Sequence, residues 1–130
     1  MPAPARADNP DLTARLAAVA GRSTLRITTR GRRTGRPHTV TIWFVVEGAT
    51  LHLGTLSTTR DWVRNVVKDP DVTLSVDGLR IRGRAVRITE PRDDAHVRAL
   101  LARKYWLAWI GSWFGKGPAA TFHVDRVELA

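Results

Sequence analysis

The sequence predicts an α+β fold that is mostly β, a small antiparallel barrel of about six strands with three flanking helices. Apolar and polar residues alternate with period two in several separate stretches, as in strands with one buried face. Asp77-Gly78 is a strong two-residue hairpin turn. Near Gly83 the apolar phase of a long strand slips, as a β-bulge or a barrel corner requires. Hairpin-linked strands with one bent member favour a small barrel over a parallel sheet.

The first half of the chain contributes one helix and three strands. The helix is expected to begin at Asn9-Pro10, a cap followed by proline, and to end at Gly21. Strands are expected around residues 24–28, 40–46 and 51–53, and the last two form a hairpin. The apolar face of the helix is predicted to contain Leu12, Leu16 and Val19.

A short helix is expected next, between a start at Ser57, Thr58 or Thr59 and a stop at Asp69-Pro70. Its apolar residues recur at helical spacing, while charged residues take the opposite side. The predicted apolar face contains Trp62, Val63, Val66 and Val67.

The second half continues with a strand at 72–76 and a long strand at 79–88. Leu79 and Ile81 are predicted to point inward at the start of the long strand, with Val86 and Ile88 inward at its end. A helix is then expected from about Asp93 to Tyr105, and a final strand at 121–129.

Length and composition restrict the kind of protein. A single domain is expected over residues 9–130, after a disordered leader at 1–8, because 130 residues are too few for two comfortable cores. The chain has no cysteine, which excludes disulfides and thiolate metal sites. No apolar signal or transmembrane segment is seen, so a cytoplasmic location is expected. The net charge of +9 predicts an anionic partner: nucleic acid, anionic lipid or a phosphorylated small molecule.

Three kinds of catalytic site find no support in the sequence. The serines lack a G-x-S-x-G elbow, so no hydrolytic nucleophile is predicted. The acidic pair Asp93-Asp94 is explained by the start of a helix, where negative charge is favourable. No metal site is expected, because the four histidines are scattered and show no helical i, i+4 pair with a carboxylate: His38, His52, His96 and His123.

Residues 29–38, TRGRRTGRPH, place four arginines and two glycines in ten positions. Gly31 and Gly35 allow a sharp turn that presents backbone amides, and the arginines add guanidinium groups. Pro37 fixes the exit into the next strand. Such a turn has the components of a phosphate or carboxylate cradle. The alternative is a solvated hairpin turn.

Residues 57–64 form a second candidate for anion binding. Capping hydroxyls and Arg60 stand at a helix N-terminus, where amides and the helix dipole attract anions, although ordinary capping also explains them. Trp62 is either a core residue or one wall of a slot for a planar ligand, and its valine neighbours favour the core.

The aromatic run at 105–114, YWLAWIGSWF, holds three of the five tryptophans, too many for one narrow helical face. Some of them are predicted to cover a ligand pocket, a dimer seam or a membrane surface. A lid that closes the end of the barrel is the alternative.

Three segments taken together carry a resemblance. They are TTRGRRTGRPH before a strand, then RDWVRNVVKDPDVTLSV, then RGRAV. In this order, over about residues 24–90, they resemble the deazaflavin-dependent oxidoreductases of the flavin/deazaflavin split β-barrel superfamily. That superfamily also contains the pyridoxamine-phosphate oxidase-like proteins. The resemblance implies a split β-barrel that binds coenzyme F420.

The resemblance also implies roles for residues. The cofactor-binding set is Arg32, Arg33, Thr34, Gly35, Arg36, His38, Thr41, Ser57, Thr58, Arg60 and Trp62. The substrate pocket is formed by Trp43, Tyr105, Trp109 and Trp113. Hydride would pass between reduced F420 and a small quinone, nitroaromatic or enone, and the candidate catalytic proton donors are Tyr105 and Ser57. Such chemistry resides in the cofactor, so the absence of acid, base and metal motifs is expected.

Two other functions stay open. The lysine-rich loop of the resembling family is replaced by LSTTRD at 56–61, which leaves FMN as an alternative cofactor. A non-catalytic nucleic-acid-binding barrel would use the basic strand face of Arg80, Arg82 and Arg84, but no strand shows paired exposed aromatics for base stacking. Specific nucleic-acid binding is therefore not expected, and a homodimer is left open.

Overall fold

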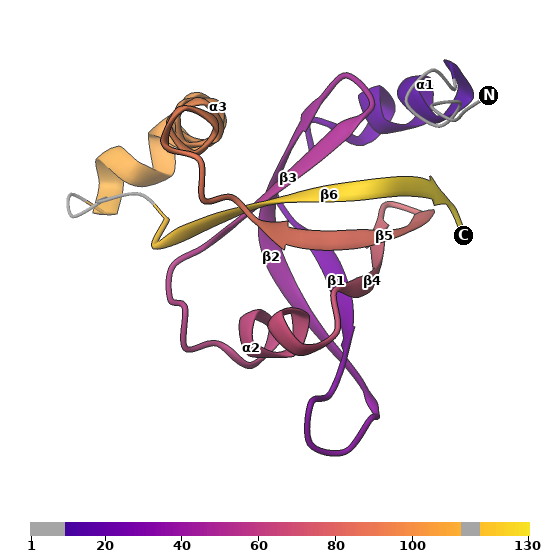
Figure 1. Cartoon of the computed structure of the whole chain (residues 1–130). Coiled ribbons are helices and arrows are strands. Elements are labelled where there is room, and N and C mark those ends of the chain that lie inside the picture. Colours follow the sequence, from indigo (N-terminus) through magenta and orange to yellow (C-terminus); the bar gives the residue numbers. More distant parts are fainter. Residues whose placement is uncertain (1–9, 113–117) are drawn as a thin grey trace.

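The computed structural model describes residues 10–112 and 118–130. Its six strands form a closed antiparallel barrel in the order β1-β2-β3-β6-β5-β4, with three helices outside it (Figure 1). The α+β, mostly β, barrel predicted from the sequence is confirmed, including the order of its elements. The elements are α1 Pro10–Val19, β1 Leu25–Arg30, β2 Pro37–Glu47, β3 Thr50–Thr55, α2 Asp61–Lys68, β4 Asp71–Val76, β5 Leu79–Arg87, α3 Pro91–Ser112 and β6 Ala120–Leu129.

The main core fills the barrel and includes residues from two helices. Period-two alternation buries one face of most strands, whereas β3 is buried on both faces, and Phe44 and Phe122 are fully buried in the interior. Helix α1 adds its predicted apolar residues to this core, and α2 adds part of its own. The helical contributions are Leu12, Leu16 and Val19 from α1, and Trp62, Val63 and Val66 from α2.

The irregularity expected near Gly83 is present, but it lies in a different strand. The pairing of β5 with β6 shifts register between Arg82 and Arg84, and Arg126 of β6 has a φ of 55°. The extra residue therefore belongs to β6, and β5 keeps its phase, with Ala85 inward. The prediction that Val86 points inward is wrong, since Val86 is 37% exposed.

Helix α2 begins later than the hydroxyl residues at 57–59 predicted. Its N-cap is Arg60, which makes no side-chain capping bond. The predicted apolar face is correct except for Val67, which is 76% exposed, because the face that meets the barrel includes Asn65 instead. Asn65 is a buried polar residue, and its hydrogen bonds connect α2 to the turn between β1 and β2.

Helix α3 is longer than predicted and continues into the aromatic run as far as Ser112, with a non-helical backbone at Tyr105. It packs against the outside of the barrel in a second small core of Val45, Ile88, Val97, Leu101 and Tyr105. The leader at 1–8, Trp113 and the side chain of Trp109 lie outside what the structure describes. Within the described residues, no helix combines the length and apolar character needed to span a bilayer.

Candidate functional site

The basic turn, residues 31–36, joins β1 to β2 and is stabilised by hydrogen bonds between its own residues. The amide of Gly31 donates to the carbonyl of Arg36 at 2.8 Å, and the amide of Gly35 donates to the carbonyl of Gly31 at 2.8 Å. The hydroxyl of Thr34 accepts a bond from the Arg36 amide at 3.2 Å. Gly35 has a φ of 74°, which glycine adopts without strain. Because these amides bond within the turn, they do not form the anion cradle expected from the sequence.

Arg32 fastens the turn to α2. The Oδ1 atom of Asn65, a residue 2% exposed, accepts bonds from the Arg32 amide at 3.1 Å and from its Nη1 at 3.0 Å. Asn65 Nδ2 donates to Thr29 Oγ1 at 3.0 Å, and Lys68 Nζ donates to the Arg32 carbonyl at 2.9 Å. Arg32 Nη2 also lies 3.3 Å from Asp61 Oδ1. Arg32 therefore holds the turn in place, and its guanidinium is engaged by α2.

Arg33, Thr34 and Arg36 are exposed, in contrast to Arg32. They border a small cavity of about 210 Å³, called here the turn cavity, which Asp61 and Asn65 of α2 close from the other side. An anion in this cavity would meet two exposed guanidinium groups, which match carboxylate and phosphate geometry. The carboxylate of Asp61 opposes the anion, so the charge balance depends on Arg33 and Arg36.

A second cavity of about 280 Å³, called here the slot, lies next to the turn cavity. It is formed by the middle of β2, the end of β3 and the start of α2. His38 and Asp61 border both cavities, so the two lie side by side. The slot brings together five residues predicted to bind cofactor or substrate: His38, Thr41, Trp43, Arg60 and Trp62.

Trp62 satisfies both interpretations offered by the sequence. It is 3% exposed, and its ring lies 5.0 Å from that of Phe122 in the barrel core. It also lines the slot. One aromatic side chain thus joins the core to the wall of the cavity, which fixes the wall rigidly.

A family model described as pyridoxamine 5'-phosphate oxidase matches residues 12–129. The chain belongs to the pyridoxamine 5'-phosphate oxidase family. No curated protein matches it significantly. The match covers both the turn cavity and the slot.

Solved structures share the fold of this family member at low identity. A putative pyridoxamine 5'-phosphate oxidase from Listeria innocua is 15% identical, with a TM-score of 0.64 over 91% of this chain and 96% of that one. An F420-H2 dependent reductase is 19% identical, with a TM-score of 0.58 over 80% and 95%. An FAD-binding protein from Mesorhizobium loti is 15% identical, with a TM-score of 0.58 over 88% and 90%. At these identities the similarity establishes the split-barrel fold.

Ser57 and Thr58, which were predicted to bind the cofactor, are not among the residues that line the slot. The Ser57 hydroxyl bonds to the Thr59 hydroxyl at 2.7 Å and accepts a bond from the Thr59 amide at 3.2 Å. Thr55 and Leu56, which the sequence did not single out, line the slot instead. The Ser57 hydroxyl thus stabilises the connection between β3 and α2 through hydrogen bonds within it.

Tyr105 lies in the interior, not in the slot where it was predicted. It is 8% exposed, and its hydroxyl accepts a bond from the Phe44 amide at 3.2 Å and lies 2.5 Å from the Ser23 carbonyl oxygen. Burial raises the pKa of the Tyr105 phenol, against a smaller lowering by its bond to the Phe44 backbone. Trp43 stacks on Tyr105 at 5.2 Å between ring centroids and also lines the slot. Tyr105 therefore supports the slot from behind Trp43 and does not present a proton to it.

Asn65 is the main site residue that sequence reasoning missed. Its signal was a polar residue three positions after Trp62, inside an apolar stripe. A buried amide in such a position requires partners, and here they are Thr29 and Arg32. Over residues 10–112 and 118–130, no cluster of three or more His, Asp or Glu side chains is arranged to hold a metal ion.

Proposed function

We propose that this chain binds the deazaflavin F420 and transfers hydride between the reduced ring and a small organic acceptor of the quinone, nitroaromatic or enone type. The observation that carries the proposal is that the slot and the turn cavity lie side by side and share His38 and Asp61. A planar ring in the slot would lie against Trp43 and Trp62, and an anionic chain leaving the ring would reach Arg33 and Arg36.

The bound deazaflavin supplies the hydride chemistry. The protein then needs to bind, orient and exclude water. Trp43 and Trp62 provide apolar walls, and Thr41 and Thr55 provide hydroxyls at the cavity surface. Arg60, at the start of α2, adds positive charge beside the ring. The roles of Trp109 and Trp113 in a substrate pocket stay predictions.

The first test is a titration of the purified chain with F420 and with FMN. F420 is expected to quench the tryptophan fluorescence saturably, because Trp43 and Trp62 border the slot. Reduced F420 is then expected to be reoxidised by a quinone or nitroaromatic only when the protein is present, as measured by the return of the deazaflavin absorbance. No saturable quenching by F420 would contradict the proposal.

A filled slot gives a sharper version of the test. Thr41 is exposed on β2 and lines the slot, so Thr41→Trp is expected to block ring binding and abolish turnover without loss of the fold. Thr50→Trp is the matched control, since Thr50 is an exposed β3 residue that does not line the slot. Equal turnover by the two variants would place the ring elsewhere.

FMN is the second candidate cofactor. The connection from β3 to α2 favours it, because residues 56–60 offer Arg60 as their one cation where the resembling deazaflavin enzymes carry a lysine-rich loop. Saturable quenching by FMN at concentrations at which F420 has no effect would select this candidate.

The proposal includes a homodimer and excludes a specific nucleic-acid partner. Trp106, 54% exposed on α3, provides apolar surface of the kind that subunit contacts bury. Sedimentation velocity is expected to show a dimer that Trp106→Ser weakens. Tight, sequence-selective DNA binding at physiological salt would instead favour the non-catalytic barrel.

A further inference from the structure

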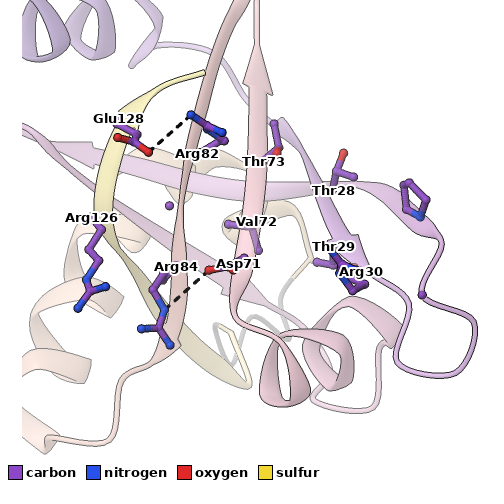
Figure 2. Close-up of a pocket in the computed structure, with 13 residues that line it drawn as sticks. Thr28, Thr29, Arg30, Asp71, Val72, Thr73, Arg82, Arg84, Arg126 and Glu128 are labelled. Atoms are coloured by element: carbon purple, nitrogen blue, oxygen red, sulfur yellow. Dashed lines mark ion pairs between the residues drawn. The ribbon is translucent and has the colours of Figure 1, made fainter.

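A third cavity, called here the arginine groove, lies on the outer face of strands β1, β4, β5 and β6 and has a volume of about 560 Å³. Figure 2 shows its charged side chains spread across these strands, from Arg30 on β1 at one side to Arg126 on β6 at the other. Among the described residues, none lines both this groove and the slot, so the groove is a separate site. The charged lining residues are Arg30, Arg82, Arg84 and Arg126, with Asp71 and Glu128.

The register of the barrel explains why polar residues of separate strands face one groove. Thr28 of β1 pairs with Thr73 of β4, which pairs with Arg82 of β5. Arg82 in turn pairs with Glu128 of β6. These residues cross the sheet as one row, and Arg84, two positions along β5, points to the same face. Hydroxyl and guanidinium groups from three strands therefore share one surface.

The bulge in β6 adds a further arginine to this face. Strict alternation along a strand would turn only every second side chain outward. The shift in register between β5 and β6 leaves Arg126 as an extra residue with a φ of 55°, and both Asp125 and Arg126 are exposed. Gly83 of β5 approaches this point so closely that a Cβ atom on it would lie 2.9 Å from the Asp125 carbonyl oxygen. The irregularity that the sequence signals near Gly83 thus contributes to the groove.

The ion pairs within the groove are loose. Arg82 Nη2 lies 3.7 Å from Glu128 Oε1, and Arg84 Nε lies 3.9 Å from Asp71 Oδ1. Exposed pairs of this kind stabilise a fold very little. A ligand anion can therefore replace either carboxylate without unfolding the protein.

The kind of anion follows from what these arginines already face. A ligand carboxylate would replace a protein carboxylate of the same charge and gain little. A phosphate group carries a charge of about −2 and three acceptor oxygens, and a guanidinium group can bind two of these oxygens at once. Outward positions of one strand lie about 7 Å apart, so a single phosphate cannot contact all the arginines fully. The groove therefore fits an anion with two or more phosphate groups.

The lining of the groove does not suit a nucleotide base. None of the described lining residues is aromatic, and the apolar side chains are those of Val72 and Pro37. Bases of single strands bind proteins largely by stacking on aromatic side chains. Thr73 instead offers a hydroxyl to the groove, and Thr28 offers a second one, which also bonds to the Thr39 hydroxyl at 2.8 Å. The ligand expected from this lining is polar and has no aromatic ring.

We infer that the arginine groove binds a small anion that carries two or more phosphate groups and no aromatic ring, such as an inorganic oligophosphate or a sugar bisphosphate. Arg82 and Arg84 make the main contacts, and Arg126 adds positive charge at the bulge. Arg30 pairs with Asp69 at 3.2 Å and lies at the edge of the site. The inference does not depend on F420, because the slot is lined by other residues.

The experiment is a calorimetric titration of the whole chain with inorganic triphosphate at about 0.15 M salt, without divalent cations. Saturable binding at one site is expected, and inorganic monophosphate is expected to bind at least about tenfold more weakly. Arg82→Gln combined with Arg84→Gln should weaken triphosphate binding by at least about tenfold. Arg80→Gln is the matched control, an exposed arginine of the same strand outside the groove, and should change the affinity by less than about twofold.

Glu128→Gln tests the inference in the opposite direction. The change removes the carboxylate that Arg82 faces and keeps the size of the side chain. Triphosphate is therefore expected to bind roughly threefold more tightly to this variant. An unchanged or lower affinity would mean that the anion does not replace Glu128, and the inference would be overturned.

The basic turn is the competing site for the same anion, so Arg33→Gln combined with Arg36→Gln is titrated in parallel. Triphosphate affinity should be kept in this variant. Loss of binding there, with normal binding in the Arg82 and Arg84 double variant, would overturn the inference and assign the anion to the turn.

Two further ligands identify what the groove takes. A hexose bisphosphate that binds more tightly than triphosphate would identify a phosphorylated sugar as the ligand, and the reverse order would identify an inorganic chain; both orders support the inference. A single-stranded oligonucleotide that displaces triphosphate and binds more tightly would overturn it in favour of nucleic acid. Absence of saturable triphosphate binding to the unmodified protein would also overturn it.

Discussion

The basic turn and strand β5 are both rich in arginine, and they use it differently. The side chain of Arg32 in the turn is 20% exposed and bonds to buried Asn65. The side chains of Arg82 and Arg84 in β5 are 61% and 43% exposed, and their ion pairs are 3.7 and 3.9 Å long. Arg32 therefore stabilises the fold, whereas Arg82 and Arg84 can exchange their carboxylate partners with little loss of free energy. The number of arginines in a segment therefore does not measure its capacity to bind anions.

The largest effect is expected from Asn65→Ala, which removes the connection between the turn and α2. Thr29 Oγ1 loses a donor and the Arg32 amide loses its acceptor, in a region shielded from water. We expect the free energy of unfolding to fall by about 3 kcal/mol, measured by chemical denaturation. Arg64→Ala, at the exposed neighbouring position, is the control and should change it by less than about 0.5 kcal/mol. Similar values for the two variants would show that Arg32 is not fastened by Asn65.

A smaller effect separates Arg32 from Arg33 within the turn. Arg32→Ala should lower the free energy of unfolding by about 1–2 kcal/mol, because its side-chain bond to Asn65 and its ion pair with Asp61 are lost. Arg33→Ala should leave stability unchanged and weaken cofactor binding by about tenfold, because its exposed guanidinium contacts only the ligand in the proposal. Thermal unfolding and titration together distinguish the two, and the reverse pattern would exchange their roles.

The strands, their order and the tight turn between β1 and β2 follow from local patterns in the sequence. Period two, the hairpin at Asp77-Gly78 and the glycines of the turn each act over a few residues. The errors concern contacts made at a distance. The extra residue lies in β6, where Gly83 approaches Val124 closely. The hydroxyl of buried Tyr105 accepts a bond from the Phe44 amide and lies 2.5 Å from the Ser23 carbonyl oxygen.

The cavities could not be predicted from the sequence for the same reason. Each is bordered by residues from strands or helices that are separated along the chain; a cavity of about 560 Å³, for example, is lined by Pro37, Asp71, Arg84 and Arg126. Side-chain patterns identify which face of a strand is polar, but they do not say which polar faces become neighbours when the barrel closes. The closure order β1-β2-β3-β6-β5-β4 supplies that information.

The stability of the protein should depend on pH through a histidine cluster on the barrel, and not through the arginines of either region. Glu47 accepts bonds from His52 at 3.0 Å and from His96 at 2.6 Å, and His123 pairs with His52 across β3 and β6. Burial lowers the pKa of His52 below its usual 6.5, outweighing the bond to Glu47. Among the described residues, His52 Nδ1 has no hydrogen-bond partner for a second proton. The unfolded chain therefore takes up a proton first. Stability is complete above pH 6.5 and falls below it, by at most about 1.4 kcal/mol per pH unit.

A second loss follows at lower pH, because the bonds from His52 and then His96 lower the pKa of Glu47 below 4.5. Denaturation curves between pH 7.5 and 5.5 should show the first slope, and His52→Leu should flatten it. His96→Gln, at an exposed histidine on the same carboxylate, should keep it. Arginine does not titrate in this range, so the contribution of Arg33 and Arg36 to cofactor affinity should stay constant while the protein is folded. If the affinity attributable to these arginines fell in parallel with stability, the histidine cluster and the basic turn would be coupled, and this prediction would be wrong.

The smallest effect on stability is expected from Glu128→Gln on β6. Glu128 is 44% exposed and lies 3.7 Å from Arg82, so removing its charge should change the free energy of unfolding by less than about 0.5 kcal/mol, measured by chemical denaturation. The change should become smaller still as added salt screens the pair. A loss as large as that of Arg32→Ala would mean that Glu128 orders Arg82 as Asn65 orders Arg32, and the two regions would then work in the same way.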